Sequence, residues 1–409
     1  MTETEPIDAA NQEGSGRCPL DPWDELQYDH RGTRTSHSPH ELWRRLREER
    51  PVIHSDKYDG FWFVSRYEDV RTVLRDWRSF TSTDGIALPS HAIVMLPGEV
   101  DPPLHQQYRA LINPLLTKEA IAEHEPWVRE MAREWIAKLP ENTEFNLTTD
   151  FCQPFAKRVA LRVIGYPEED LAALDHWGTL VAHGARSDEE GQQAYAEFFK
   201  LFTQALSRRA EEGPAPNLIS SLVFGEIDGR RLTDSEQQSM LLEITFGGLD
   251  TTSAVLAGAL VWLAGHPVDR ARLRAEPDLW ETAVEEFVRY VTPVSSMARA
   301  ATKEVKLGGC PVGKGDKILV GYGSANRDTS AFDKPDDVVL DRSPNPHVGF
   351  GFGPHRCAGS NLGVLGVRIG LQEFLAAFEH FEVTDYYALR WSQGESRGLQ
   401  EAPMTARRA

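Results

Sequence analysis

Cysteine is scarce in this chain, and its four cysteines lie far apart. Cys18, Cys152, Cys310 and Cys357 include no C-x-x-C pair. This spacing argues against a disulfide framework, a structural zinc site and an iron–sulfur cluster, because each of these needs closely grouped or systematically spaced cysteines. A reducing compartment fits this pattern, and we expect a cytoplasmic location.

Long apolar runs are also lacking. The N-terminal segment has no hydrophobic stretch of the kind found in secretory signals, and the most apolar helical run, near 254–264, is too short to cross a bilayer. We therefore expect no membrane association. Residues 1–17 have the composition of a disordered tail. No linker or repeat divides the remainder, so we expect one domain over 18–409.

Positive charge is in deficit. The chain has 44 Lys and Arg against 62 Asp and Glu, which gives a formal net charge of −18. A nucleic-acid partner is therefore not expected. The Gly-x-Gly-x-x-Gly fingerprint of flavin and nicotinamide sites is missing as well.

Helical periodicity dominates what is present, and the pattern predicts a mainly α fold with small β-sheets. One stretch, 82–97, shows little periodicity and predicts a long surface loop of the kind that carries function. The main predicted helices cover 39–50, 67–76, 101–116, 121–139, 151–163 and 233–265. The predicted strands cover 51–54, 60–64, 304–307 and 317–321.

One cysteine lies in a distinctive loop. Residues 350–359 read Phe-Gly-Phe-Gly-Pro-His-Arg-Cys-Ala-Gly, and a buried-helix pattern follows from Ala358. The N-terminus of a helix favours a thiolate, as do the neighbouring His355 and Arg356, so we expect the sulfur of Cys357 to be anionic. Such a thiolate can be a nucleophile, a redox thiol or a metal ligand, and a small buried cysteine is the plain alternative.

The segment 233–265 predicts a long central helix that is interrupted by Gly247 and Gly248. Each glycine costs about 1 kcal/mol relative to alanine inside a helix, so a function should offset that loss. The hydroxyl of Thr251 can bond a carbonyl one turn back and hold a kink open. With Asp250 beside it, this niche suits O₂ and a proton route. A glycine pair that serves helix packing, with an incidental acid, is the alternative.

Five separate motifs together resemble those of cytochromes P450. The loop F-G-x-G-x-H-x-C-x-G is similar to the haem-ligand loop of that family, and G-G-x-D-T-T is similar to its oxygen-activation motif. The other three are D-P-P-x-H-x-x-x-R at 101–109, E-x-x-R at 286–289, and F-x-x-P at 332–335 followed by Arg342. The glycine motif also resembles the bacterial camphor-hydroxylase branch.

The resemblance implies a triangular-prism fold with haem b between the glycine-kinked helix and the helix after the cysteine loop. Cys357 would be the axial thiolate of the iron, Asp250 would gate proton delivery, and Thr251 would stabilise bound oxygen. Four basic residues would hold the haem propionates: His105, Arg109, Arg299 and His355. Three others would form a structural triad: Glu286, Arg289 and Arg342.

The substrate pocket is expected on the face of the central helix that carries Asp250 and Thr251. Counting back by helical turns places Glu243 on the same face, where it would anchor a polar or cationic substrate group. Pairing of Glu243 with a neighbouring Arg or His is the alternative. The full set of expected pocket residues is Glu243, Phe246, Gly247, Val294, Ser295 and Ser296.

The implied reaction inserts one atom of O₂ into a C–H bond of a hydrophobic small molecule such as a terpenoid, steroid, aromatic compound or secondary metabolite. Electrons from NAD(P)H would arrive through a ferredoxin and a ferredoxin reductase, with Arg356 and Lys118 as docking contacts. A P450-fold peroxygenase or oxidative coupling enzyme is one alternative, and a non-catalytic haem sensor is another.

Overall fold

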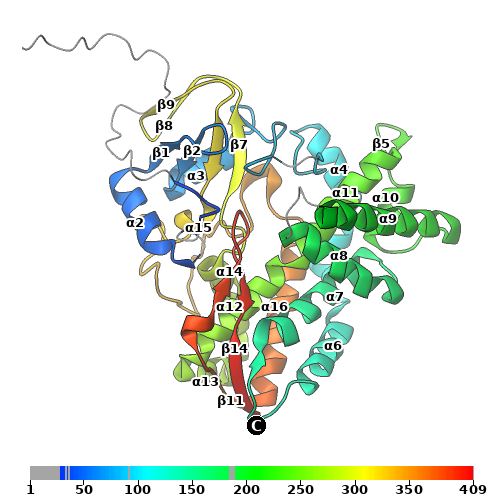
Figure 1. Ribbon diagram of the computed structural model, residues 1–409, viewed down its shortest axis with the longest axis vertical. Helices are drawn as coiled ribbons and strands as arrows, with labels where there is room; N and C mark the ends of the chain where they lie inside the picture. Colours follow the sequence, from blue (N-terminus) through cyan, green and yellow to red (C-terminus); the bar gives the residue numbers. More distant parts are fainter. Residues whose placement is uncertain (1–27, 33–34, 36, 91–92, 184–188, 409) are drawn as a thin grey trace, which may run out of the picture.

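The computed structural model describes residues 28–32, 35, 37–90, 93–183 and 189–408 (Figure 1). The expected tail at 1–17 lies outside this range, and one domain over 18–409 stays a prediction. Helices occupy the right and lower parts of Figure 1, and the principal sheet lies at the upper left. The predicted mainly α architecture with small sheets is confirmed.

The helices form most of the molecule. They are α2 (His40–Glu49), α3 (Tyr67–Arg75), α4 (Leu104–Ile112), α5 (Lys118–Ala122), α6 (Glu125–Ala137), α7 (Gln153–Ile164), α8 (Leu171–His183), α9 (Glu189–Glu212), α10 (Leu218–Phe224), α11 (Asp234–Leu249), α12 (Thr251–Ala264), α13 (Pro267–Ala275), α14 (Trp280–Val291), α15 (Tyr322–Ala325) and α16 (Ser360–Ala377).

The strands are short. They are β1 (Val52–Ser55), β2 (Phe61–Val64), β3 (Phe80–Thr81), β4 (Phe145–Asn146), β5 (Glu226–Ile227), β6 (Arg230–Arg231), β7 (Met297–Ala301), β8 (Val305–Leu307), β9 (Cys310–Val312), β10 (Lys317–Val320), β11 (Phe378–Val383), β12 (Arg390–Trp391), β13 (Leu399–Glu401) and β14 (Pro403–Arg408).

The principal sheet has the order β1-β2-β10-β7-β3. Strand β10 pairs in parallel with β2 and antiparallel with β7, where Ile318 lies opposite Arg299. A second sheet has the order β11-β14-β4. The inner position of β7 in the principal sheet fixes the backbone of Arg299, which is almost fully buried.

The central helix is divided at Asp250, so the predicted helix over 233–265 is present as α11 and α12. The hydroxyl of Thr251 donates to the carbonyl of Gly247 at 2.9 Å, which stabilises the break. The two glycines have different surroundings. A Cβ on Gly247 would meet nothing within 4 Å, whereas one on Gly248 would lie 2.7 Å from Ala160. Gly248 therefore allows α11 to approach α7, and only Gly247 leaves open space.

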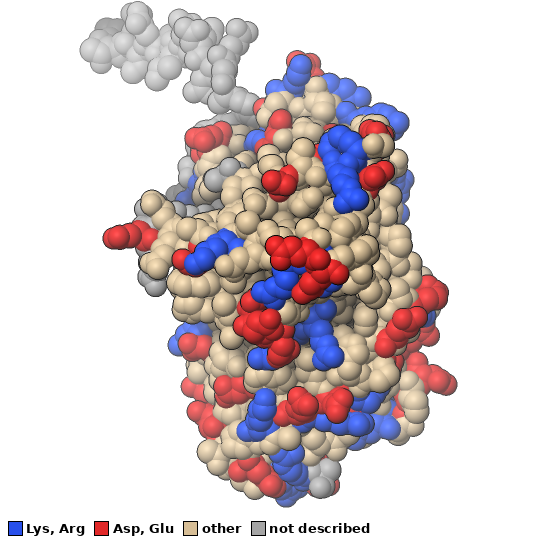
Figure 2. All heavy atoms as spheres, turned by 90° about the vertical axis from the view of Figure 1, so that its right-hand side faces the viewer, with Lys and Arg blue, Asp and Glu red and all other residues tan. Residues whose placement is uncertain are grey.

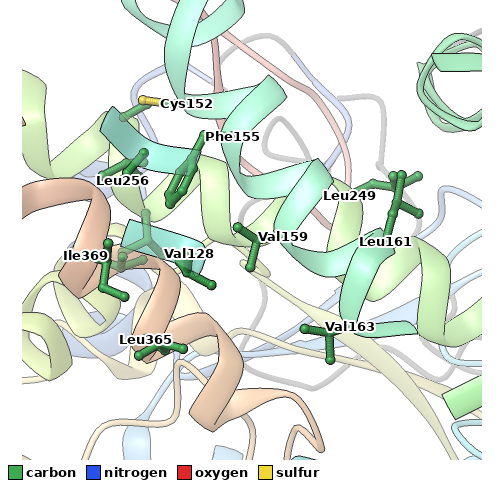
Figure 3. Close-up of a cluster of buried hydrophobic side chains, with 14 of the residues drawn as sticks. Val128, Cys152, Phe155, Val159, Leu161, Val163, Leu249, Leu256, Leu365 and Ile369 are labelled. Atoms are coloured by element: carbon green, nitrogen blue, oxygen red, sulfur yellow. The ribbon is translucent and has the colours of Figure 1, made fainter. Parts of the chain in front are cut away.

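Aliphatic and aromatic side chains join α7, α12 and α16 into the main core (Figure 3). Phe155 and Leu256 are fully buried there, and Gly370 lets both approach α16 closely. The span Asp234–Ala264 is long and apolar enough to cross a membrane by length and composition, but 56% of its apolar window is buried by protein. This burial is typical of the core helix of a globular fold.

A largely buried ion cluster connects α14 to the chain before the cysteine loop. The carboxylate of Glu286 accepts from Arg289 at 2.7 and 2.8 Å and from Arg342 at 2.9 Å. The backbone N–H of Val339 donates to the same carboxylate at 2.8 Å. Glu286 and Arg289 have no exposed surface. The three residues expected as a structural triad are thus brought together, with every charge hydrogen-bonded.

Candidate functional site

The cysteine loop is held in a defined course by glycine and by backbone hydrogen bonds. Gly351 and Gly353 have φ values of +70° and +73°, a region that favours glycine. A Cβ on Gly353 would lie 2.4 Å from the carbonyl oxygen of Leu74 at the end of α3. The N–H of Cys357 donates to the carbonyl of Phe350 at 2.8 Å. The loop therefore presents the sulfur from a fixed backbone.

The expected helix N-terminus at Cys357 needs correction, because α16 begins three residues later at Ser360. Cys357 retains exposed surface, yet protein atoms surround its sulfur densely, and this desolvation raises the pKa of the thiol. The Gly359 N–H and the guanidinium groups of Arg109 and Arg356 act in the opposite direction. The expectation that neighbouring protein groups alone favour a thiolate is therefore wrong.

A raised pKa argues against a nucleophilic or redox role for Cys357, since both need a readily formed thiolate. A bound cationic metal would reverse the balance, because a coordinating thiol is deprotonated. The described part of the chain contains no group of three or more His, Cys, Asp or Glu that could hold a metal ion. A metal at Cys357 would therefore have to bring its other ligands with it.

Four basic side chains gather near this loop from three elements. His105 and Arg109 lie on α4, Arg299 lies on β7 and His355 precedes the cysteine. The ring centroids of the two histidines are 4.2 Å apart. Burial lowers the pKa of His105 to about 4 and that of His355 to about 2, and repulsion by the two arginines adds to both shifts.

Among the described residues no carboxylate pairs directly with these basic groups, and Asp101 acts on His105 only through its charge. The Nδ1 atom of His105 is buried without a hydrogen-bond partner in the part of the chain that the structure describes. A buried group of basic side chains that lower one another's pKa favours a negatively charged ligand. The site therefore suits a ligand that carries anionic groups.

Sequence reasoning missed the residues that position this cluster. The Oγ atom of Ser82 lies 3.2 Å from Nε2 of His355, and Asp101 accepts the N–H of Ser82 at 3.1 Å. The D-P-P segment does not itself form helix, because α4 begins at Leu104. Instead, Asp101 connects the loop after β3 to the site. The motif contained Asp101, but no local signal pointed to Ser82.

The break in the central helix contacts a small pocket of mixed polar and apolar lining. Asp250 and Thr251 line it together with side chains from segments more than 90 residues away. The polar residues that these segments contribute are Gln153, Ser392, Ser396, Arg397 and Gln400. Hydroxyl and amide groups therefore share a pocket with Asp250 and Thr251, and such groups can pass protons.

Comparison with known proteins identifies the family. The Cytochrome P450 family profile matches residues 183–386. A probable cytochrome P450 127A1 of Sinorhizobium fredii is 33% identical over 352 residues, which cover 85% of this chain and 83% of that protein. A putative cytochrome P450 123 of Mycobacterium tuberculosis is 31% identical and covers 96% and 98%. The chain belongs to the cytochrome P450 family. The structure of the Bacillus subtilis P450 PksS agrees, with a TM-score of 0.84, 28% identity and coverage of 93% and 100%.

As a cytochrome P450, the protein is a haem-thiolate monooxygenase that uses O₂ and reducing equivalents. The residues present fit that cofactor. Cys357 offers one sulfur to a metal that brings its own remaining ligands, and the basic cluster with the orphaned Nδ1 of His105 suits two propionates. The open space at Gly247 adjoins the break at Asp250.

Glu243 of this P450 lies on the same face of α11 and accepts the backbone N–H of Gly98 at 2.7 Å through Oε2. Glu243 forms no ion pair with an Arg or His within 4.0 Å among the described residues, and Arg109 acts on its charge only at longer range. Burial raises the pKa of Glu243 to about 7. The Gly98 N–H opposes this shift in pKa, Glu99 adds to it, and Arg109 opposes it.

The other expected pocket residues differ in their surroundings. Phe246 is half-buried, with its ring 5.6 Å from that of Phe198 in an edge-to-face contact. Val294 is half-buried as well. The hydroxyl of Ser295 is engaged, because it donates to the carbonyl of Glu395 at 3.0 Å. The hydroxyl of Ser296 is buried with no partner among the described residues.

Proposed function

We propose that this P450 hydroxylates a hydrophobic small organic molecule in the cytoplasm, with haem b held by Cys357 and electrons delivered by a ferredoxin and its NAD(P)H-dependent reductase. His105, Arg109, Arg299 and His355 bind the two propionates. The observation that carries the proposal is the cysteine beside a basic cluster that forms no ion pair with any carboxylate in the described part of the chain. The cofactor, when bound, supplies the oxidising chemistry from O₂ and two electrons.

Asp250 and Thr251 move the proton that this chemistry consumes. The Thr251 hydroxyl is oriented by the Gly247 carbonyl at 2.9 Å, and Asp250 at the helix break lines the pocket described above. Water in that pocket can pass a proton to Asp250, which relays it toward Thr251. A peroxide-driven enzyme needs no such route, so the pocket favours the O₂-dependent reaction over peroxygenase or coupling chemistry.

The surface beside the cysteine loop suits an acidic electron donor. Arg356 is exposed, and so is Arg75, whose guanidinium lies 5.3 Å from the ring of Phe352 in the loop. Lys118 pairs with Glu281 at 3.7 Å, but both side chains are largely exposed, so this pair is weak. By contrast, acidic and basic side chains are interspersed on the face in Figure 2.

A charge reversal tests the docking face. At low ionic strength, ferredoxin should reduce the haem of Arg356→Glu about tenfold or more slowly than that of the wild type. Added salt should make the two rates more similar. Arg407→Glu is the control, because Arg407 lies on β14, at the far end of α16 from the cysteine loop. With 18 residues, α16 is about 27 Å long. Equal slowing by both variants, or by neither, would argue against this docking face.

The decisive experiment on the cofactor is the absorption spectrum of the reduced carbon monoxide complex, which separates thiolate-ligated from histidine-ligated haem. The wild-type protein should show the thiolate form, and Cys357→Ser should lose it. Cys310→Ser is the matched control, because Cys310 is buried in β9 and bonds the carbonyl of Val52. Purified protein without porphyrin, or an unchanged spectrum in Cys357→Ser, would refute the proposal.

A second measurement distinguishes the O₂-dependent monooxygenase from the peroxygenase alternative. Asp250→Asn and Thr251→Ala should lower turnover with O₂ and the ferredoxin pair while leaving turnover with hydrogen peroxide largely intact. Equal loss in both assays would show that these residues serve the pocket rather than the proton route.

A further inference from the structure

We infer that the substrates of this P450 carry a cationic nitrogen on a hydrophobic body, and that Glu243 binds this nitrogen through its Oε1 atom. The inference rests on the proposed function and specifies the ligand class of the same site.

The two oxygens of the Glu243 carboxylate are in different situations. Oε2 accepts the N–H of Gly98 at 2.7 Å. Oε1 accepts no hydrogen bond from any residue that the structure describes, and the side chain is only half-buried. One oxygen is thus fixed to the protein, and the other remains for a ligand. Even partial removal from water is costly for a carboxylate that lacks a counter-charge, and a cationic ligand offsets that cost.

The carboxylate is held in place by the loop above it. A Cβ on Gly98 would lie 2.6 Å from Oε1, so only glycine allows the loop to pack this closely on Glu243. One turn earlier on α11, the Ser239 hydroxyl donates to the Val94 carbonyl at 2.6 Å and accepts the N–H of Leu96 at 3.0 Å. The loop and α11 are therefore joined at two successive turns, which preorganises the carboxylate.

Helical spacing places Glu243 on the same face as the residues at the break. Glu243, Phe246, Gly247 and Asp250 follow one another at i, i+3, i+4 and i+7 on a single helical face. The charge of Glu243 acts on both Arg109 and Cys357, so the carboxylate lies within electrostatic range of the cofactor site. Phe246 adds an aromatic ring one turn away, and such a ring attracts alkylammonium groups.

Neighbouring charges leave the role of Glu243 open to a ligand. Glu99 directs its carboxylate to the N–H groups of Ile86 and Met95, at 3.2 and 2.9 Å. Arg109 donates instead to the Arg356 carbonyl at 2.8 Å and to Asn113 at 2.9 Å. Glu99 is itself acidic and Arg109 donates elsewhere, so neither gives Glu243 a counter-charge by direct contact.

A pair of ligands of equal shape tests the inference. Phenyltrimethylammonium and tert-butylbenzene differ by one charge, and a quaternary nitrogen cannot coordinate haem iron. The wild-type holoenzyme, titrated by haem spin-state shift and by equilibrium dialysis, should bind the cation at least about tenfold more tightly than the neutral compound. Equal or reversed affinities in the wild type would overturn the inference without any variant.

The variant Glu243→Gln sharpens the result, because its amide oxygen can still accept the Gly98 N–H. It should lose about tenfold or more of the affinity for the cation and keep its affinity for tert-butylbenzene within about twofold. Glu281→Gln, at an exposed position, is the control and should change neither. Unchanged cation affinity in Glu243→Gln would assign Glu243 to loop attachment alone. If the cation affinity is unchanged while the same preparation gives the reduced carbon monoxide spectrum of a thiolate-ligated haem, the inference about Glu243 fails and the proposed function stands.

Discussion

Two charged clusters in this P450 differ in how completely the protein matches their charges. Around Glu286, both carboxylate oxygens accept hydrogen bonds, and the arginines also donate to backbone carbonyls. Around Cys357, the pKa values of His105 and His355 are lowered by burial and by neighbouring cations, and the pKa of Glu243 is raised to about 7. The first cluster is complete, and the second still requires ligands.

This difference separates maintenance of the fold from function. A buried charge that is paired with an opposite charge holds distant segments together. Removing one partner leaves the other charge buried without a counter-charge, which destabilises the fold. An unmatched buried charge lowers stability by itself and is retained where a ligand supplies the counter-charge. Substitutions in the two clusters should therefore have different consequences.

The largest effect is expected from Glu286→Gln. The change leaves the guanidinium groups of Arg289 and Arg342 buried without a counter-charge, which should cost about 3–5 kcal/mol in the free energy of unfolding. Urea unfolding of the holoenzyme measures it. Glu281→Gln, which breaks an exposed pair with Lys118, should cost less than about 0.5 kcal/mol. Similar losses in both variants would contradict the contrast between the clusters.

In the basic cluster, Arg299→Leu should weaken cofactor binding more than it weakens the fold. Loss of one charged hydrogen bond is worth about 1.5–3 kcal/mol, so transfer of haem to a scavenging apoglobin should be at least about tenfold faster. Arg368→Leu, which breaks a half-buried pair with Glu125, is the control. Unchanged haem transfer in Arg299→Leu would remove Arg299 from the propionate site.

The sequence predicted those parts of the site that depend on helical spacing and short motifs. Thr251 meets the carbonyl of Gly247 across the break because they are four positions apart, and Glu286 meets Arg289 because they are one turn apart. The expected break near the glycine pair is present as well.

Contacts between distant loops could not be predicted from the sequence. The Gly98 N–H reaches Glu243 across 145 positions, and Ser82 reaches His355 across 273, so no periodic pattern contains either contact. The expectation of an anionic sulfur at Cys357 failed for a different reason. The sequence showed favourable charges near the sulfur but not the burial that outweighs them.

The binding of cations should depend on pH if Glu243 is their partner. Its pKa is raised to about 7, so the carboxyl is neutral below that pH and anionic above it. Between pH 6 and pH 8 the affinity for phenyltrimethylammonium should rise about tenfold, following the ionised fraction. The charged groups that face Glu243 are Glu99, Arg109 and Cys357.

Two controls accompany this pH profile. Tert-butylbenzene should bind with nearly constant affinity over the same range, and Glu243→Gln should show no rise for the cation. A rise that persists in Glu243→Gln would assign the titration to another group.

The smallest effect is expected from Ser239→Ala, which loosens the loop without touching a charge. Loss of the hydroxyl removes the bonds to Val94 and Leu96, each worth about 1 kcal/mol, so amide hydrogen exchange at Leu96 should accelerate about fivefold or more. Ser392→Ala is a matched control, because that hydroxyl also donates to one backbone group and accepts from another, at Ser396 and Gly398. It should accelerate exchange at Gly398 and leave residues 94–98 unchanged.

The preference of Ser239→Ala for the cation, measured as the ratio of its affinities for phenyltrimethylammonium and tert-butylbenzene, should fall to about half to a third of the wild-type ratio. The carboxylate of Glu243 stays in place, but the loop orients it less firmly. Complete loss of that preference would mean that the loop, rather than Glu243, recognises the charge.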